Sequence, residues 1–139
     1  MEGFDLFKDY LVVEESLNGL RAIRIMTWDG EEHYLKFNDP VYLATTTSNL
    51  DFDTPVLRYR YTSLTTPNST FEYNMATKEQ VLLKRDEVVD PNFSPENYTS
   101  ERLYATAQDG TKVPVSLVYK TGVKQQGPMP VLLYAYGSY

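Results

Sequence analysis

The sequence contains no cysteine and a single histidine, His33, and these two shortages limit the chemistry open to it. Without cysteine there is no disulfide, no thiol nucleophile and no cysteine-based metal site. A Ser-His-Asp triad would have to use His33. No Gly-X-Ser-X-Gly segment, the turn that presents a nucleophilic serine between a strand and a helix, occurs in the sequence. We therefore do not expect the chain to hold a complete hydrolytic centre of its own.

Positive charge and long apolar runs are also scarce. Lysine and arginine number 13 against 19 acidic residues, which gives a formal net charge of −6. Nucleic acids and anionic membranes require a basic surface, so we expect neither as a partner. The longest apolar run, residues 131–136, is far shorter than the roughly 18 to 20 residues that cross a bilayer. No signal peptide is visible at residues 1–5, which favours a cytoplasmic location.

Acidic residues cluster in two loops without the pattern of a metal site. Asp51 and Asp53 lie two positions apart, and Asp86, Glu87 and Asp90 form a second group. Neither group has the ligand number or spacing of a calcium loop. We expect solvated loop acids here, and neither a metal nor a cofactor.

Tyrosine, valine and threonine are abundant, which favours strands over helices. Residues 9–16 and 20–27 are two β-rich runs on either side of Leu17-Asn18-Gly19. Asn-Gly is typical of a tight hairpin turn because both residues tolerate a positive φ. A short third strand is predicted at residues 33–37, where His33 is expected to be a surface residue.

Four further short strands are predicted at residues 41–48, 55–63, 69–75 and 80–84. Strand 55–63 alternates apolar and polar residues, a pattern typical of a strand with one buried face. The residues expected inside are Leu57, Tyr59 and Tyr61, and those expected outside are Arg58 and Arg60. Antiparallel units of roughly 40 to 45 residues in tandem suggest propeller blades. An antiparallel sandwich is the alternative, because periodicity alone does not separate the two.

The character of the sequence changes after residue 85. Residues 86–97 combine prolines and acids without a sustained period, and we interpret them as a linker. Residues 101–120 are predicted to form a hairpin that turns at Asp109-Gly110. The apolar run 130–136 is predicted to be a strand buried on both faces, as in a sheet covered by helices. We therefore expect the chain to be a piece of a larger protein.

Two C-terminal segments, 109–119 (DGTKVPVSLVY) and 130–139 (PVLLYAYGSY), resemble the prolyl oligopeptidase family of serine peptidases, in particular its oligopeptidase B (protease II) branch. Residues 9–15 (DYLVVEE) and 57–67 (LRYRYTSLTTP) resemble the last propeller blades of that branch. The resemblance implies a seven-bladed β-propeller that caps an α/β-hydrolase domain. Residues 1–95, including most of the linker 86–97, would be about the last two blades of the propeller. Residues 96–139 would be the opening strands of the hydrolase domain, so the chain is mainly β and truncated.

The same resemblance implies a function and one site residue. The parent would be a serine endopeptidase that hydrolyses short peptides after Lys or Arg, with its triad residues outside this sequence. Tyr136 occupies the position whose hydroxyl donates to the oxyanion hole in this family. Ala135 stands where the family usually has glycine, which puts the geometry of that turn in question. Ser138 is interpreted as a turn residue and not as a nucleophile.

The alternative function is a non-catalytic β-propeller or β-sandwich module that binds other proteins. We also expect the isolated chain to self-associate, because its C-terminal strands would leave apolar faces and unpaired edges exposed.

Overall fold

The structure is a computed structural model in which residues 2–137 are described. Its first four strands form an antiparallel sheet in which each strand pairs with the next along the chain. The strands are β1 (Gly3–Leu6), β2 (Tyr10–Leu17), β3 (Leu20–Thr27) and β4 (Glu32–Tyr34). The predicted hairpin is β2–β3, and the predicted third strand is β4, which is shorter than expected. The sequence analysis missed β1, since its residues GFDL include a glycine and an aspartate, which strands disfavour.

The turn between β2 and β3 has the geometry that its residues predict. Asn18 and Gly19 have φ angles of 54° and 73°, and the residues on either side of them, Leu17 and Leu20, are paired. Two consecutive residues with positive φ form the type of turn whose twist matches that of the flanking strands. The Asn-Gly sequence therefore fixes the register of this hairpin.

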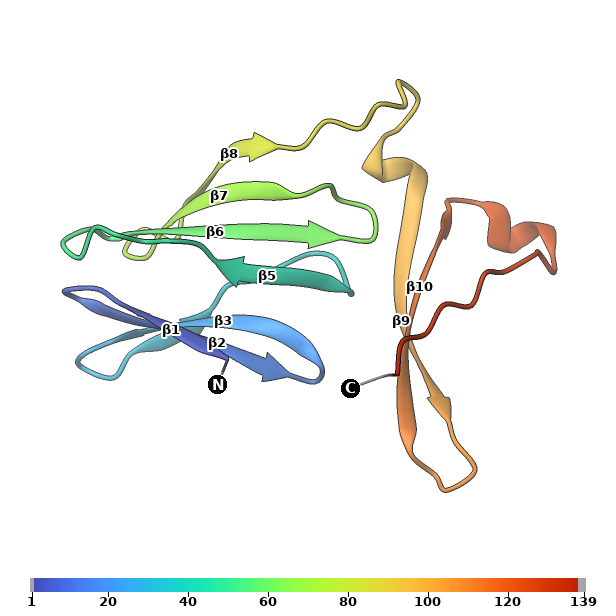
Figure 1. The fold of residues 1–139 in the computed structure, drawn as a ribbon, viewed down its shortest axis with the longest axis horizontal. Coiled ribbons are helices and arrows are strands. Elements are labelled where there is room, and N and C mark those ends of the chain that lie inside the picture. The colour runs from blue at the N-terminus through green and yellow to red at the C-terminus, as the bar shows by residue number, and fades with distance from the viewer. Residues whose placement is uncertain (1, 138–139) are drawn as a thin grey trace.

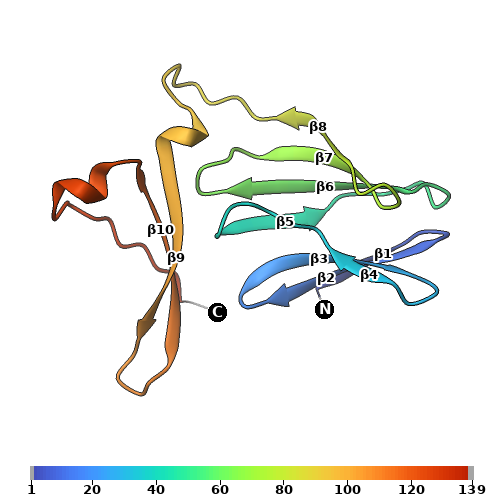
Figure 2. The same ribbon diagram turned by 180° about the vertical axis from the view of Figure 1, so that it is seen from behind.

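The next four strands repeat the arrangement. They are β5 (Tyr42–Thr46), β6 (Val56–Ser63), β7 (Ser69–Asn74) and β8 (Gln80–Arg85), paired in chain order. All four predicted strands are confirmed. In Figures 1 and 2 the two sheets lie next to each other, with β3 and β5 as the neighbouring strands.

One hydrophobic core is shared by the two sheets. Phe7, Val12, Ile23 and Ile25 belong to the same buried cluster as residues of the second sheet. The alternation predicted for β6 is confirmed: its inward residues are fully or almost fully buried, and its two arginines are exposed. A strand with one buried face places every second side chain in the core, and this burial is the main force that holds the sheets together.

The remainder of the chain follows the second sheet in sequence. Residues 86–97 are irregular and end in a 3₁₀ turn, η1 (Pro95–Asn97). Strands β9 (Tyr98–Thr106) and β10 (Lys112–Lys120) form the predicted hairpin, and a second 3₁₀ turn, η2 (Val123–Gln126), follows. The hairpin runs across the ends of both sheets (Figure 1). No helix between residues 2 and 137 is long and apolar enough to span a membrane.

The prediction of a buried strand at residues 130–136 is wrong for this structure. This segment is irregular and pairs with no described strand, and its side chains are exposed, with Leu132 at 90% and Tyr134 at 84%. A strand needs a neighbour to accept and donate its ladder hydrogen bonds and a layer to cover each apolar face. Neither is supplied to this segment by the described residues, so an apolar sequence alone does not make it a strand.

Candidate functional site

The predicted oxyanion donor Tyr136 lies in the irregular segment that follows η2, and 70% of its surface is exposed. An oxyanion donor acts from a fixed position in a site that excludes water. Residues 130–137 by themselves do not form such a site. Ser138, which was predicted to be a turn residue, lies outside the described residues.

The alanine beside this tyrosine does not strain the backbone. Among the described residues other than glycine, only Asn18 and Lys78 have a positive φ, so the φ of Ala135 is negative. A methyl group is tolerated in that region of backbone conformation. The departure from the glycine of the family is therefore compatible with the local conformation seen here.

The single histidine is engaged in a contact between the two sheets. His33 lies on β4, and its Nε2 is 2.9 Å from the hydroxyl of Tyr73 on β7. The side chain is partly buried, and burial together with the nearby Lys78 ammonium lowers the pKa of the imidazole below its usual value. The neutral imidazole is thus favoured, in a position that links the sheets. The expectation of a simple surface residue was too coarse.

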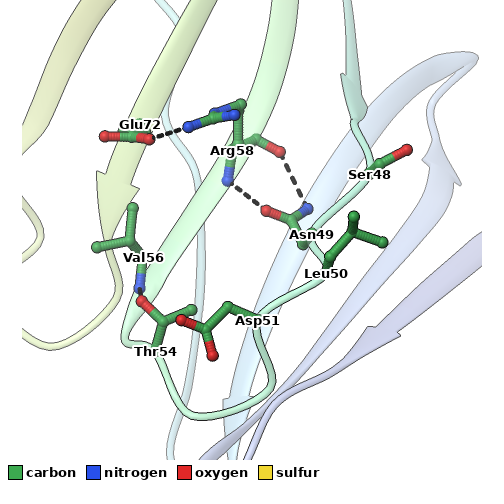
Figure 3. Close-up of a pocket in the computed structure, with 8 residues that line it drawn as sticks. All are labelled: Ser48, Asn49, Leu50, Asp51, Thr54, Val56, Arg58 and Glu72. Atoms are coloured by element: carbon green, nitrogen blue, oxygen red, sulfur yellow. Dashed lines mark hydrogen bonds and ion pairs between the residues drawn. The ribbon is translucent and has the colours of Figure 1, made fainter.

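A polar groove lies beside the loop that connects β5 to β6 (Figure 3). The side chain of Asn49 pairs there with the backbone of Arg58, since its Oδ1 accepts from the Arg58 N–H at 2.7 Å and its Nδ2 donates to the carbonyl oxygen at 3.1 Å. The amide therefore extends the β5–β6 ladder in the manner of one more strand residue. The guanidinium of Arg58 binds the Glu72 carboxylate at 2.5 Å. The hydrogen-bonding groups of Asn49, Arg58 and Glu72 are thus paired with one another. We therefore interpret this groove, of about 300 Å³, as structural.

A buried carboxylate that the sequence analysis did not single out also joins the two sheets. Glu14 on β2 is only 7% exposed; its Oε1 accepts a hydrogen bond from the backbone N–H of Thr46 on β5, and its Oε2 is 3.3 Å from Nη1 of Arg21. A buried charge needs such partners to offset its loss of hydration. The signal was present in the sequence, because Glu14 shares the inward face of its strand with Val12.

No metal centre is formed by the described residues. Nowhere between residues 2 and 137 do three or more His, Asp or Glu side chains come close enough to hold an ion. The two loop clusters of acids are exposed, and the carboxylate of Asp53 pairs with Lys8 at 3.0 Å.

Two four-stranded antiparallel sheets in tandem are the repeating arrangement of a β-propeller. The sequence pattern of the family described as "Prolyl oligopeptidase, N-terminal beta-propeller domain" matches residues 1–86, which contain both sheets. The chain belongs to this family. Propeller blades are therefore favoured over the sandwich that the sequence left open, and the resemblance noted in the sequence is confirmed.

Similarity to individual proteins extends beyond residue 86. Dipeptidyl aminopeptidase BI of Pseudoxanthomonas mexicana is 43% identical over 140 residues, covering 100% of this chain and 19% of its own length. Protease 2 of Moraxella lacunata is 35% identical over 133 residues, covering 96% of this chain and 19% of its own length. The structure of oligopeptidase B from Trypanosoma brucei with covalently bound antipain, in a closed form, covers 99% of this chain and 20% of its own with a TM-score of 0.83 and 32% identity. The chain thus spans about a fifth of the length of these relatives.

Proposed function

We propose that this chain is part of a serine oligopeptidase. It contributes two propeller blades in residues 1–95, including most of the linker 86–97, and the opening strands of an α/β-hydrolase domain in residues 96–139. The observation that carries the proposal is the continuity of the similarity, which runs across both sheets, the linker and the β9–β10 hairpin to the end of the chain. A propeller module alone would account for residues 1–86 only.

In this proposal the substrates of the complete enzyme are short peptides, cleaved after Lys or Arg. The finer specificity comes from the resemblance to the oligopeptidase B branch, and no acidic residue of this chain is assigned to the recognition of a basic side chain. The Lys/Arg preference is tested by measuring how the complete enzyme hydrolyses arginyl, prolyl and unblocked dipeptidyl amide substrates. Cleavage confined to the prolyl or the dipeptidyl substrate would exclude the Lys/Arg preference.

The catalytic contribution of this chain is the hydroxyl of Tyr136. In the complete hydrolase sheet, the run 130–136 acquires strand neighbours and covering helices, which fix Tyr136 at the carboxyl end of a buried strand. Strand ends of that kind frame the active-site crevice of α/β folds. A hydroxyl held there, about 2.7–3.1 Å from the developing oxyanion, stabilises the tetrahedral intermediate.

The isolated chain is inactive in this proposal, because its single histidine is committed to the contact with Tyr73 and the sequence contains no nucleophile elbow. Labelling with a serine-directed fluorophosphonate tests this point. We expect no labelling of the 139-residue chain. We expect labelling of a chimera in which this chain replaces the equivalent segment of the Pseudoxanthomonas relative. A labelled isolated chain, or a folded chimera without activity, would contradict the proposal.

A further inference from the structure

A second groove lies where the edge of the first sheet meets the second sheet. It has a volume of about 380 Å³. Its lining residues are His33, Tyr34, Leu35 and Lys36, on β4 and directly after it, and Tyr73, Lys78 and Gln80, on β7, the following turn and β8. The groove is therefore made by both sheets and is present only when they are packed together. It is separate from Tyr136, which belongs to the C-terminal segment.

The lining of this groove is unusual for an acidic protein. None of the described residues that line it is an aspartate or glutamate, although the chain as a whole has a net charge of −6. Between residues 2 and 137, neither Lys36 nor Lys78 forms an ion pair. Two lysine ammonium groups therefore share one groove without a neutralising carboxylate, and such a surface attracts anions.

The uncharged groups of the groove supply hydrogen-bond donors. The hydroxyl of Tyr73 is within hydrogen-bond distance of Nε2 of His33, at 2.9 Å. The Oε1 of Gln80 accepts from the Tyr59 hydroxyl at 2.9 Å, which leaves the amide N–H groups of Gln80 as donors. When His33 is protonated, both ring nitrogens donate, so Nε2–H can bind the Tyr73 oxygen and release the phenolic proton for another acceptor.

From this juxtaposition we infer that the groove between the two sheets binds an oxoanion, either a phosphate group or the terminal carboxylate of a peptide. Lys36 and Lys78 supply the charge, Tyr73 and Gln80 supply directed hydrogen bonds, and His33 orients the Tyr73 hydroxyl. Lysine side chains suit such a ligand, because phosphate and carboxylate groups each accept several charge-assisted hydrogen bonds. The inference does not depend on the peptidase assignment.

The charged groups around the imidazole make it a reporter of this binding. Lys78 faces His33 from the β7–β8 turn, Lys36 lies two residues after the end of β4, and Tyr73 contacts the imidazole from β7. Its partner in β3 is Ile25, which carries no charge. In the free groove, burial and then Lys78 lower the pKa of His33. A bound anion favours the imidazolium, so it raises that pKa, and the anion binds more tightly as the pH falls.

Because His33 is the only histidine, its ring Cε1–H gives a single and assignable NMR signal in the full chain. We would titrate this signal with sodium phosphate at constant ionic strength, at a protein concentration where light scattering gives the monomer mass. A parallel titration uses N-acetyl-dialanine, with N-acetyl-dialanine amide as its uncharged counterpart. Saturable shifts and a higher His33 pKa with phosphate alone assign a phosphate ligand. The same response with the acid but not the amide assigns a peptide carboxylate.

Substitutions then separate the groove from general charge attraction. Lys78→Gln and Lys36→Gln should each weaken binding about two- to fivefold. Lys112→Gln on the β9–β10 hairpin removes the same charge away from the groove and should leave the affinity unchanged. Absence of saturable binding by either anion would overturn the inference, as would equal weakening by Lys78→Gln and Lys112→Gln.

Discussion

The guanidinium of Arg102 on β9 donates a hydrogen bond from Nη2 to the backbone carbonyl of Asn18, at 2.7 Å and across 84 positions of sequence. The hairpin that follows the linker is thereby attached to the tip of the β2–β3 turn in the first sheet. A Cβ at the neighbouring Gly19 would lie 3.0 Å from the same Nη2. Glycine at position 19 therefore allows both the tight turn and the close approach of Arg102.

Gly19→Ala should destabilise the chain by about 1–2 kcal/mol, because a Cβ is strained at a φ of 73°. The arginine must also shift away from the new methyl group, which weakens its bond to Asn18. Urea denaturation measures the first effect, and amide hydrogen exchange in β9 measures the second. Gly3→Ala is the matched control, since nothing lies within 4 Å of its added Cβ and its φ is not positive. An equal loss of stability in both variants would contradict the explanation.

Much of the architecture was predictable because it depends on local signals. The Asn-Gly turn and the alternation of β6 each specify which residues pair and which face inward. The same signals do not specify which sheet lies against which. Glu14 contacts Thr46, and His33 contacts Tyr73. No local sequence pattern predicts that these distant segments are in contact.

The structure of the C-terminal run 130–136 could not be predicted from local signals. Its composition indicates a strand that is buried on both faces, and burial of this kind is a property of the surrounding layers. Within the described residues those layers are not supplied, and Leu132 and Tyr136 are exposed. The catalytic role of Tyr136 was predicted only from the family resemblance, because nothing else distinguishes a tyrosine at the end of a predicted strand.

The core beneath β6 should tolerate truncation poorly. Leu57 is fully buried at 0% exposure, so Leu57→Ala removes apolar contacts and leaves a cavity that should cost about 2–5 kcal/mol. Leu50 is 94% exposed in the preceding loop, and Leu50→Ala should change stability by less than about 0.5 kcal/mol. Midpoints and slopes of urea unfolding for the two variants make the comparison. A small effect at Leu57 would mean that the two sheets do not share the core described here.

Stability should depend on pH through His33. The folded chain lowers the pKa of its imidazole from the usual value of 6.5, so the unfolded chain binds the proton more readily. The stabilisation from the neutral imidazole is complete above pH 6.5. It is lost as the pH falls through 6.5 and then through the lower pKa of His33 in the folded chain. The free energy of unfolding should therefore be smaller at pH 5.5 than at pH 7.5.

Urea unfolding in MES and HEPES buffers, without phosphate, measures this difference. His33→Gln keeps a polar side chain without a proton to titrate in this range, and it should flatten the dependence. An ordinary solvated carboxylate titrates near about pH 4, below this pH range. An unchanged pH dependence in His33→Gln would assign the effect to another group.

In the serine oligopeptidase proposed above, Tyr136→Phe should lower kcat about 10²–10³-fold with little change in KM, since the proposal places this hydroxyl against the oxyanion that forms in the transition state. Tyr134→Phe removes the same atom two positions earlier and should leave kcat near that of the wild type. Steady-state kinetics with a peptide amide substrate test both. Wild-type turnover in Tyr136→Phe would remove this residue from the mechanism.

The isolated chain should self-associate through the apolar C-terminal run. Val131, Leu132 and Leu133 are 77%, 90% and 83% exposed, and consecutive exposed apolar residues form a patch that water disfavours. Leu132→Asp places a charge in the middle of this patch and should lower the apparent mass in light scattering at a given concentration. Leu50→Asp introduces the same charge at a single exposed leucine, so it should leave association unchanged. If both variants reduce association equally, the added negative charge is the cause; if neither does, the contact between copies lies elsewhere, for instance along the exposed strand β8.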